Sequence, residues 1–161
     1  MKTQSEKDAI CCPKFDPALY DEKILVWENK LFVKGRVCTI FYMPLNYGGA
    51  IRRLTGHIAK GKGVILDYMM LSDHTSKWNM NIYIAVDKEV KGVENEKFSG
   101  KYFCKVFEGS FKKTGKWCKE FEQVATAKGY KFQKLLMWYT TCPKCAKKYG
   151  KNYVAILAEV E

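Results

Sequence analysis

Arginine is rare in this sequence, and long apolar runs are absent. Arg36, Arg52 and Arg53 are its only arginines, although 28 basic residues exceed 17 acidic ones and leave a net charge of +11. The lysines are scattered along the chain, which argues against a dedicated nucleic-acid surface. No apolar run approaches the length that crosses a bilayer, and the first residues lack the apolar segment of a secretory signal. We therefore expect neither a membrane nor a nucleic acid as its partner.

Histidine is also scarce, which narrows the chemistry. His57 and His74 are the only two, and neither stands at triad-like spacing from a cysteine or a serine, so covalent acyl chemistry has little support. Gly48-Gly49 and Gly61-Lys62-Gly63 lack the flanking lysine and hydroxyl residue of a phosphate-binding loop. We expect no cofactor.

The chain does contain enough apolar residues for a core. It has 161 residues, of which 47% are hydrophobic, as expected for one globular domain. Aromatic residues reach 14%, which suits a pocket lined by flat side chains, although aromatic residues more often belong to a core. Because we expect no export route, we interpret the seven cysteines as reduced thiols of a cytoplasmic protein.

The first part of the chain divides into an arm and a module of four elements. Residues 1–29 contain two prolines and little periodicity, so we expect an irregular arm that packs across the main fold through Phe15 and Trp27. Residues 30–88 read as strand, helix, strand, strand, with Asn46 as the N-cap of the helix. The four elements are expected at 31–42, 46–61, 64–71 and 78–86.

The same order of elements recurs in residues 98–161, after a polar connector at 87–99. Ser110 opens the second helix and Gly129 ends it, at the places that Asn46 and Gly63 take in the first module. The sequence therefore predicts a single α+β domain, in which tandem β-α-β-β modules form one antiparallel sheet with two main helices packed against it. The second set of elements is expected at 101–107, 110–128, 130–140 and 152–160, with an insert at 142–150.

Glu108 lies at the junction between a predicted strand and a predicted helix. Its neighbours Phe107 and Phe111 are aromatic, and Ser110 is a plausible helix N-cap. A carboxylate in this place would be a pocket acid if it were buried. The alternative is a solvated loop residue that complements the helix dipole.

Four stretches of the sequence resemble the GyrI-like small-molecule-binding superfamily, in particular a subgroup of stand-alone members often labelled hydrolases. The resemblance covers nearly the whole chain, and its most specific stretch is the last. The stretches are Cys11-Cys12-Pro13-Lys14-Phe15-Asp16, Pro44-Leu45-Asn46, Val106-Phe107-Glu108-Gly109 and Tyr139-Thr140-Thr141-Cys142-Pro143-Lys144-Cys145-Ala146-Lys147-Lys148-Tyr149-Gly150.

The resemblance implies a ligand pocket between the two modules, walled by aromatic side chains and a buried carboxylate. Glu108 is then the expected catalytic residue, since burial would raise its pKa and it could position a water as a general base. Trp138 and Tyr139 are adjacent on a strand, so only one of them can line a given side. The expected ligand-binding residues are Tyr68, Tyr83, Trp117, Trp138 and Tyr139.

Two further features allow more than one interpretation. Asp67 interrupts an apolar strand, so it marks an exposed edge or is a second pocket acid. Cys142-Pro143-Lys144-Cys145 is a structural turn near the pocket, a redox pair, or half of a zinc site completed by Cys11 and Cys12. Adjacent cysteines are awkward chelators, and the sequence by itself predicts no metal.

We expect a protein that binds a small hydrophobic or cationic molecule. The resemblance also implies hydrolysis, because some stand-alone members are reported to add water across the strained ring of cyclopropane-bearing toxins. The alternatives are a non-catalytic binder of ligands or partners and, with less support, a basic nucleic-acid-binding protein. The sequence does not predict the oligomeric state.

Overall fold

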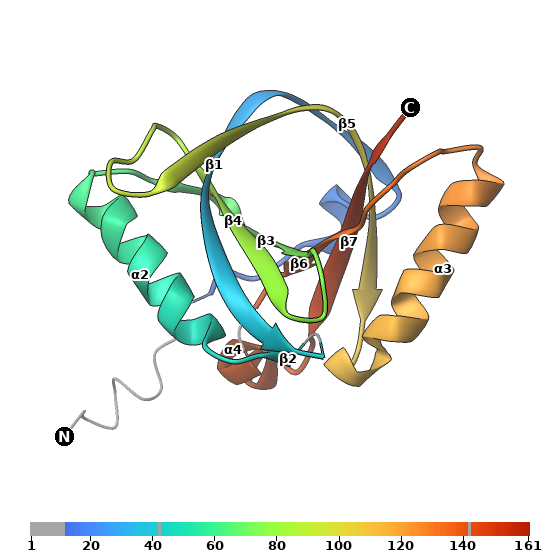
Figure 1. Ribbon diagram of the computed structural model, residues 1–161. Helices are drawn as coiled ribbons and strands as arrows, with labels where there is room; N and C mark the ends of the chain where they lie inside the picture. Colours follow the sequence, from blue (N-terminus) through green and yellow to red (C-terminus); the bar gives the residue numbers. More distant parts are fainter. Residues whose placement is uncertain (1–11, 42, 142) are drawn as a thin grey trace.

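The computed structural model describes residues 12–41, 43–141 and 143–161, and it has the order strand, helix, strand, strand twice (Figure 1). A short 3-10 helix, η1 (Pro17–Leu19), precedes the first strand. The first half consists of β1 (Lys23–Ile40), the two-residue β2 (Met43–Pro44), α2 (Tyr47–Lys60), β3 (Ile65–His74) and β4 (Asn79–Val86). The second half consists of β5 (Glu94–Glu108), the 3-10 helix η2 (Phe111–Lys113), α3 (Thr114–Ala127), β6 (Leu136–Tyr139), α4 (Pro143–Tyr149) and β7 (Tyr153–Val160).

All strand pairs are antiparallel and belong to one sheet, in the order β2-β1-β4-β3-β6-β7-β5. The two halves join where β3 meets β6, at the pairs Leu71–Trp138 and Ser72–Met137. They join again where β1 pairs with β5, which closes the sheet into a barrel-like ring. The predicted α+β fold with a single antiparallel sheet is therefore confirmed.

The two main helices cover the outer face of the sheet, one on each half (Figure 1). In α2 the buried residues Ala50, Leu54 and Ile58 recur at helical spacing, and they pack against apolar residues of β1 and β4. Close contact with β1 is possible because Gly35 has no side chain: a Cβ there would stand 2.8 Å from Leu54 Cδ1.

The second helix uses the same device on the other half. Trp117, Phe121 and Ala125 of α3 are buried and pack against apolar residues of β5, β6 and β7. A third apolar cluster lies on the face of the sheet away from both helices. It contains Phe32, Met69, Leu71, Tyr83, Ala85, Tyr102, Cys104, Leu136, Trp138, Ala155 and Leu157.

Element boundaries differ from prediction mainly around β1 and β5. β1 begins at Lys23, so residues 23–29 belong to the sheet and not to an irregular arm. β5 begins at Glu94, within the expected connector. A register shift between Trp27 and Lys30, with Asn29 at φ 50°, interrupts the alternation of side chains along β1. Because of this interruption, periodicity did not predict the first part of the strand. Trp27 is nevertheless packed in the sheet, with its ring centroid 4.3 Å from that of Tyr102.

Helix starts and the last strands show smaller differences. Ser110 caps η2, because its Oγ accepts from Lys112 N at 3.3 Å, and α3 begins only at Thr114. Asn46 holds the N-cap position of α2 without a side-chain cap hydrogen bond. Within the expected strand at 130–140 only Leu136–Tyr139 pairs, and the expected insert contains α4. None of the helices in the described ranges combines the length and the hydropathy needed to cross a membrane.

Candidate functional site

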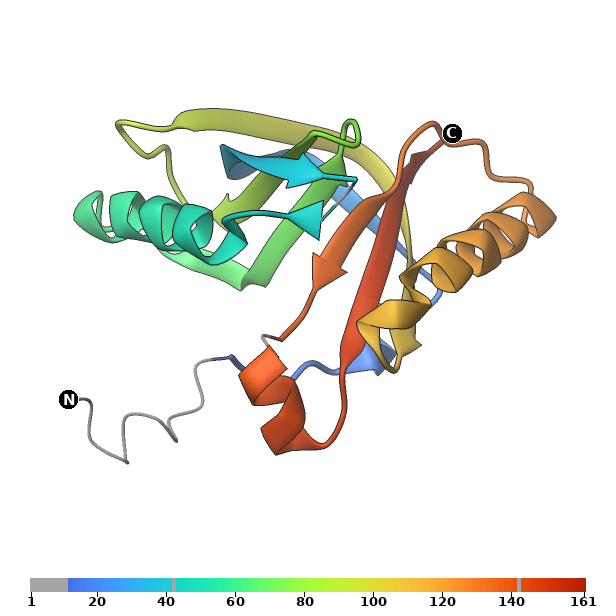
Figure 2. The ribbon, with the colours of Figure 1, turned by 60° about the horizontal axis from the view of Figure 1, so that its bottom comes forward.

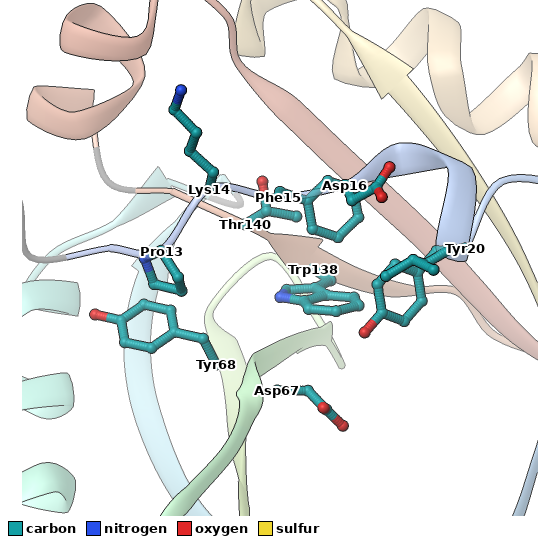
Figure 3. Close-up of a pocket in the computed structure, with 10 residues that line it drawn as sticks. Pro13, Lys14, Phe15, Asp16, Tyr20, Asp67, Tyr68, Trp138 and Thr140 are labelled. Carbon is teal, nitrogen blue, oxygen red and sulfur yellow. The ribbon is translucent and has the colours of Figure 1, made fainter.

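A pocket of about 130 Å³ lies between the N-terminal arm, which is residues 12–22, and the inner face of the sheet, which is the face away from α2 and α3 (Figure 3). β3 contributes Asp67 and Tyr68, and β6 contributes Trp138, with Thr140 directly after it. The arm supplies the remaining lining residues: Pro13, Lys14, Phe15, Asp16, Leu19 and Tyr20.

Three aromatic rings form one side of this pocket. Phe15 and Tyr20 stack on each other with centroids 5.2 Å apart and planes 14° apart. Each then meets the ring of Trp138 edge-on, at 5.2 Å and 4.9 Å respectively. Edge-on contacts of this kind are favourable because the positive edge of one ring faces the negative face of the other. Two rings of the arm therefore cover Trp138, the largest fully buried side chain of the inner face.

The opposite wall is a strained part of β3. Asp67 and Tyr68 have φ of 54° and 50°, in the left-handed region, at a register shift between Ile65 and Met70. For residues with a Cβ this conformation costs on the order of 1–2 kcal/mol each. The bulge turns both side chains into the lining of the pocket (Figure 3). Backbone strain of this kind clusters at active sites and ligand clamps.

The pocket has two carboxylates, Asp16, whose Oδ1 accepts from Ala18 N at 3.0 Å, and Asp67. The Asp67 side chain is 54% exposed, and its Oδ2 lies 3.7 Å from Lys30 Nζ. Burial, followed by the charge of Asp67, raises the pKa of the Tyr20 hydroxyl. Both sequence interpretations of Asp67 hold in part, since the carboxylate is exposed and also lines the pocket.

Polar contacts at both ends hold the arm in place. The Cys12 thiol donates to Tyr68 Oη at 3.8 Å, and the Tyr149 hydroxyl of α4 donates to the carbonyl oxygen of Cys12. At the other end, Asp21 Oδ1 accepts from Val106 N at 3.0 Å. Residues 13–20 therefore lie over the sheet between two fixed ends, Cys12 and Asp21. These contacts explain why a segment with little periodicity has a defined position.

Two of the five expected ligand-binding residues, Tyr68 and Trp138, line the pocket. A third, Tyr83, is buried. It lies on the same face of the sheet as Trp138, because Leu71 pairs with Tyr83 on one side and with Trp138 on the other. Lys34 Nζ stands 5.8 Å from the centroid of the Tyr83 ring. Burial is the main cause that raises the pKa of the Tyr83 hydroxyl, so this group remains a neutral donor at neutral pH.

Trp117 and Tyr139, the other two, lie on the helix-covered side of the sheet. Trp117 stacks on Phe107, with centroids 5.7 Å apart, inside the core beneath α3. Tyr139 meets Phe111 edge-on at 5.7 Å, and burial, aided by Tyr47 and Cys118, raises its pKa to about 12. Adjacent strand residues point to opposite faces, so Trp138 and Tyr139 are separated by the sheet, as expected.

Glu108 is exposed, and the prediction of a buried carboxylate at this position is wrong. It is the last residue of β5 and pairs with Tyr153, the first residue of β7, so it lies at the rim of the sheet. Gly109, with φ 138°, then turns the chain away, and its carbonyl accepts from Asn152 Nδ2 at 2.8 Å. Glu108 borders an open groove of about 390 Å³ that shares no lining residue with the arm pocket. A catalytic role for Glu108 stays a prediction.

Of the cysteines in the two motifs, Cys12 directly precedes the pocket residue Pro13, and Cys145 lies in α4. Cys12 and Cys145 are buried, at 4% and 0% exposure. Cys11 and Cys142, which the zinc interpretation also needs, lie outside the described residues. Across residues 12–41, 43–141 and 143–161 there is no group of three or more histidine, cysteine or acidic side chains placed to hold a metal ion.

Sequence reasoning missed Tyr20 and Asp16 as pocket residues, and it assigned Phe15 only an anchoring role. The signal was present in the stretch Cys11–Asp16, which leads directly into the pocket lining. Periodicity cannot detect such residues, because the arm is neither helix nor strand and gains its position from contacts distant in sequence.

Comparison with known proteins agrees with this architecture. Residues 2–160 match the sequence model of a family described as bacterial hydrolase. No protein with a curated description matches the chain. The chain is also similar to a crystal structure of the EcmrR C-terminal domain, with a TM-score of 0.70 at 13% identity, over 89% of this chain and 98% of that one.

A second similar structure is a hydrolase from Listeria innocua, with a TM-score of 0.62 at 12% identity, over 88% of this chain and 93% of that one. An uncharacterised conserved protein from Listeria innocua has a TM-score of 0.64 at 12% identity, over 88% and 94% of the two chains. At such identities the likeness shows the fold alone. The family match and the structural likeness fit the GyrI-like fold that the sequence resembles.

Proposed function

Because the chain belongs to the bacterial hydrolase family, we propose that it binds a planar, apolar small molecule on Trp138 and adds water to a reactive group of that molecule. The observation that carries the proposal is the aromatic enclosure of Phe15, Tyr20 and Trp138 with a carboxylate, Asp67, at its edge. Flat rings that meet edge-on provide a surface on which another flat ring gains dispersion and quadrupole contacts. The strained strand that presents Asp67 and Tyr68 supports a role in binding over a role in stability.

The ligand takes the place that the arm now fills. A cavity of about 130 Å³ is smaller than the roughly 300–1,000 Å³ of most small-molecule sites. Phe15 and Tyr20 therefore swing aside when a ligand enters, while the anchors at Cys12 and Asp21 keep the arm attached. The arm then closes over the bound molecule and limits its exposure to bulk water.

The proposed reaction is addition of water to a strained electrophile such as a cyclopropane conjugated with a carbonyl group. Asp67 accepts a hydrogen bond from a water molecule and orients its oxygen toward a ring carbon. The water oxygen bonds to that carbon, the strained carbon–carbon bond breaks, and the released electron pair takes up a proton. The net change is one water added to one ring, which needs no oxidant, reductant or metal ion.

Turnover is tested with a spirocyclopropyl cyclohexadienone, which opens to a hydroxyethyl phenol when it takes up water. The product is followed by its ultraviolet absorbance and identified by mass. We expect saturable hydrolysis by the wild-type protein, and strongly reduced hydrolysis by Trp138→Ala. Trp78→Ala serves as the matched control, because Trp78 is 58% exposed and does not line the pocket.

A non-catalytic binder is the second candidate function. It is favoured by one observation, the pairing of Asp67 with Lys30, which engages the carboxylate that would orient water. This candidate predicts saturable binding of the same dienone with a hydrolysis rate equal to that in buffer. Absence of both binding and turnover would refute the small-molecule proposal in either form.

A further inference from the structure

The indole N–H of Trp138 is a buried hydrogen-bond donor. Trp138 is 1% exposed, and among the residues that the structure describes none accepts a hydrogen bond from its Nε1. A buried donor left unpaired costs on the order of 1–3 kcal/mol, and native proteins leave few such groups. We therefore look for a functional reason why an unpaired donor lies at the wall of a pocket.

The position of this N–H relative to the pocket provides one. In Figure 3 the indole nitrogen lies on the side of the ring that faces Pro13 and Tyr68, away from Tyr20. Pro13, Tyr68 and Trp138 all line the same cavity. The donor therefore lies next to the part of the pocket between the arm and the bulge of β3, buried beneath its lining.

The neighbouring groups that the structure describes are engaged elsewhere, and none accepts from this donor. Thr140, directly after β6, donates its hydroxyl to Tyr153 O at 2.8 Å. Tyr68 Oη accepts from the Cys12 thiol at 3.8 Å. Phe15 and Tyr20 present their rings to the indole, and a ring is a poor substitute for an oxygen or nitrogen lone pair.

We propose that Trp138 Nε1 is the specificity-determining donor of the pocket, and that the ligand has a flat conjugated ring with a hydrogen-bond acceptor, a carbonyl oxygen or a ring nitrogen, at its edge. This inference rests on the proposed small-molecule site and names the chemical class that the site selects. A planar hydrocarbon would gain the ring contacts and leave the donor unpaired. A ligand with an acceptor would gain both, and the gain is largest where water is excluded.

The chemistry of the proposed reaction gives this donor a second use. If the acceptor is a carbonyl conjugated with the strained ring, negative charge develops on its oxygen as the ring opens. A hydrogen bond from Trp138 Nε1 would then strengthen in the transition state. The same contact would thus select the ligand and favour its hydrolysis.

Quinoline and naphthalene are the probes, because they have the same shape and differ by one ring nitrogen in place of a C–H group. Their dissociation constants are measured by calorimetry at neutral pH for wild type, Trp138→Phe and Trp27→Phe. Trp27→Phe is the matched control, since Trp27 packs on the same inner face but does not line the pocket. The comparison of two probes in two proteins cancels the difference in hydrophobicity between them.

We expect the preference for quinoline over naphthalene to fall about fivefold in Trp138→Phe and to be unchanged in Trp27→Phe, since one net neutral hydrogen bond is worth about 1 kcal/mol. A second measurement uses only the wild-type protein, so it does not depend on whether a variant folds. Quinoline, but not naphthalene, should move the indole N–H resonance of Trp138 downfield in the NMR spectrum of ¹⁵N-labelled protein. An equal preference in wild type and Trp138→Phe, or an unmoved resonance at saturation, would overturn this inference and leave the aromatic pocket standing. Failure of both probes to bind wild type would overturn the proposed function as well.

Discussion

Lys30 and Asp67 join two irregularities of the sheet, with Nζ and Oδ2 3.7 Å apart. Lys30 follows Asn29, whose φ is 50°, at the register shift between β1 and β5. Asp67 lies in the register shift between β3 and β4. The ion pair thus connects the bulge that bends β1 with the bulge that shapes the pocket. Because both bulges depart from regular pairing, each has a side chain free to reach across the inner face.

A hydrolysis assay should distinguish the two candidate catalytic carboxylates, Asp67 and Glu108. Asp67→Asn is expected to lower the turnover of the dienone about a hundredfold, because a group that orients or deprotonates water typically contributes that much. Glu108→Gln, at the sheet rim, is expected to leave turnover within about twofold of wild type, a change of under about 0.5 kcal/mol in the barrier. The opposite pattern would return the catalytic role to Glu108.

Removing the lysine of the ion pair tests the charge of the pocket. Lys30→Met should change the free energy of unfolding by less than about 1 kcal/mol, because the Asp67 carboxylate is 54% exposed and solvent screens the pair. It should strengthen the binding of a planar cation such as proflavine a few-fold, since Asp67 is then unpaired. Naphthalene affinity is the internal control and should not change. If naphthalene and proflavine respond alike, Asp67 does not face the ligand.

Shortening Phe15 should open the pocket. Phe15→Ala removes a half-buried ring that contacts Tyr20 and Trp138, and we expect unfolding free energy to fall by about 1–2 kcal/mol. Naphthalene should nevertheless bind faster and at least as tightly, because the ring it displaces is gone. Stopped-flow tryptophan fluorescence measures the association rate. Phe111→Ala, which removes a ring on the opposite side of the sheet, should leave that rate unaltered.

Alkali should destabilise the fold through Tyr102 and Tyr139. Burial raises the pKa of both hydroxyls to about 12, from 10.0 in the unfolded chain. The folded state therefore favours the neutral hydroxyls, a contribution that is fully present below pH 10 and is lost as pH rises from 10 to 12. For the partly buried Tyr139 the loss approaches about 2 kcal/mol, and Tyr139→Phe should remove this part of the dependence. Urea denaturation at several pH values measures the slope, and an unchanged slope in Tyr139→Phe would contradict the assignment.

Local patterns in the chain predicted the elements that carry a periodic signal. The stripe of Ala50, Leu54 and Ile58 and that of Trp117, Phe121 and Ala125 specify which face of each helix is buried, because burial of that face stabilises the helix. The alternation along a strand likewise placed Trp138 and Tyr139 on opposite sides of the sheet. These features depend on neighbours three or four residues away at most, so the sequence alone determines them.

Contacts between distant segments decided the site itself. The arm residues Phe15 and Tyr20 reach Trp138 only because Cys12 is tied to Tyr149 and Asp21 is tied to Val106. Pairing of β5 with β7 continues to Glu108 and Tyr153, and so leaves Glu108 at an exposed rim rather than in a pocket. Asp67 lines the pocket because of a bulge in β3, and the periodicity of the sequence does not predict this bulge. Such positions depend on how the chain closes on itself, since the free energy that holds them comes from partners far away in sequence.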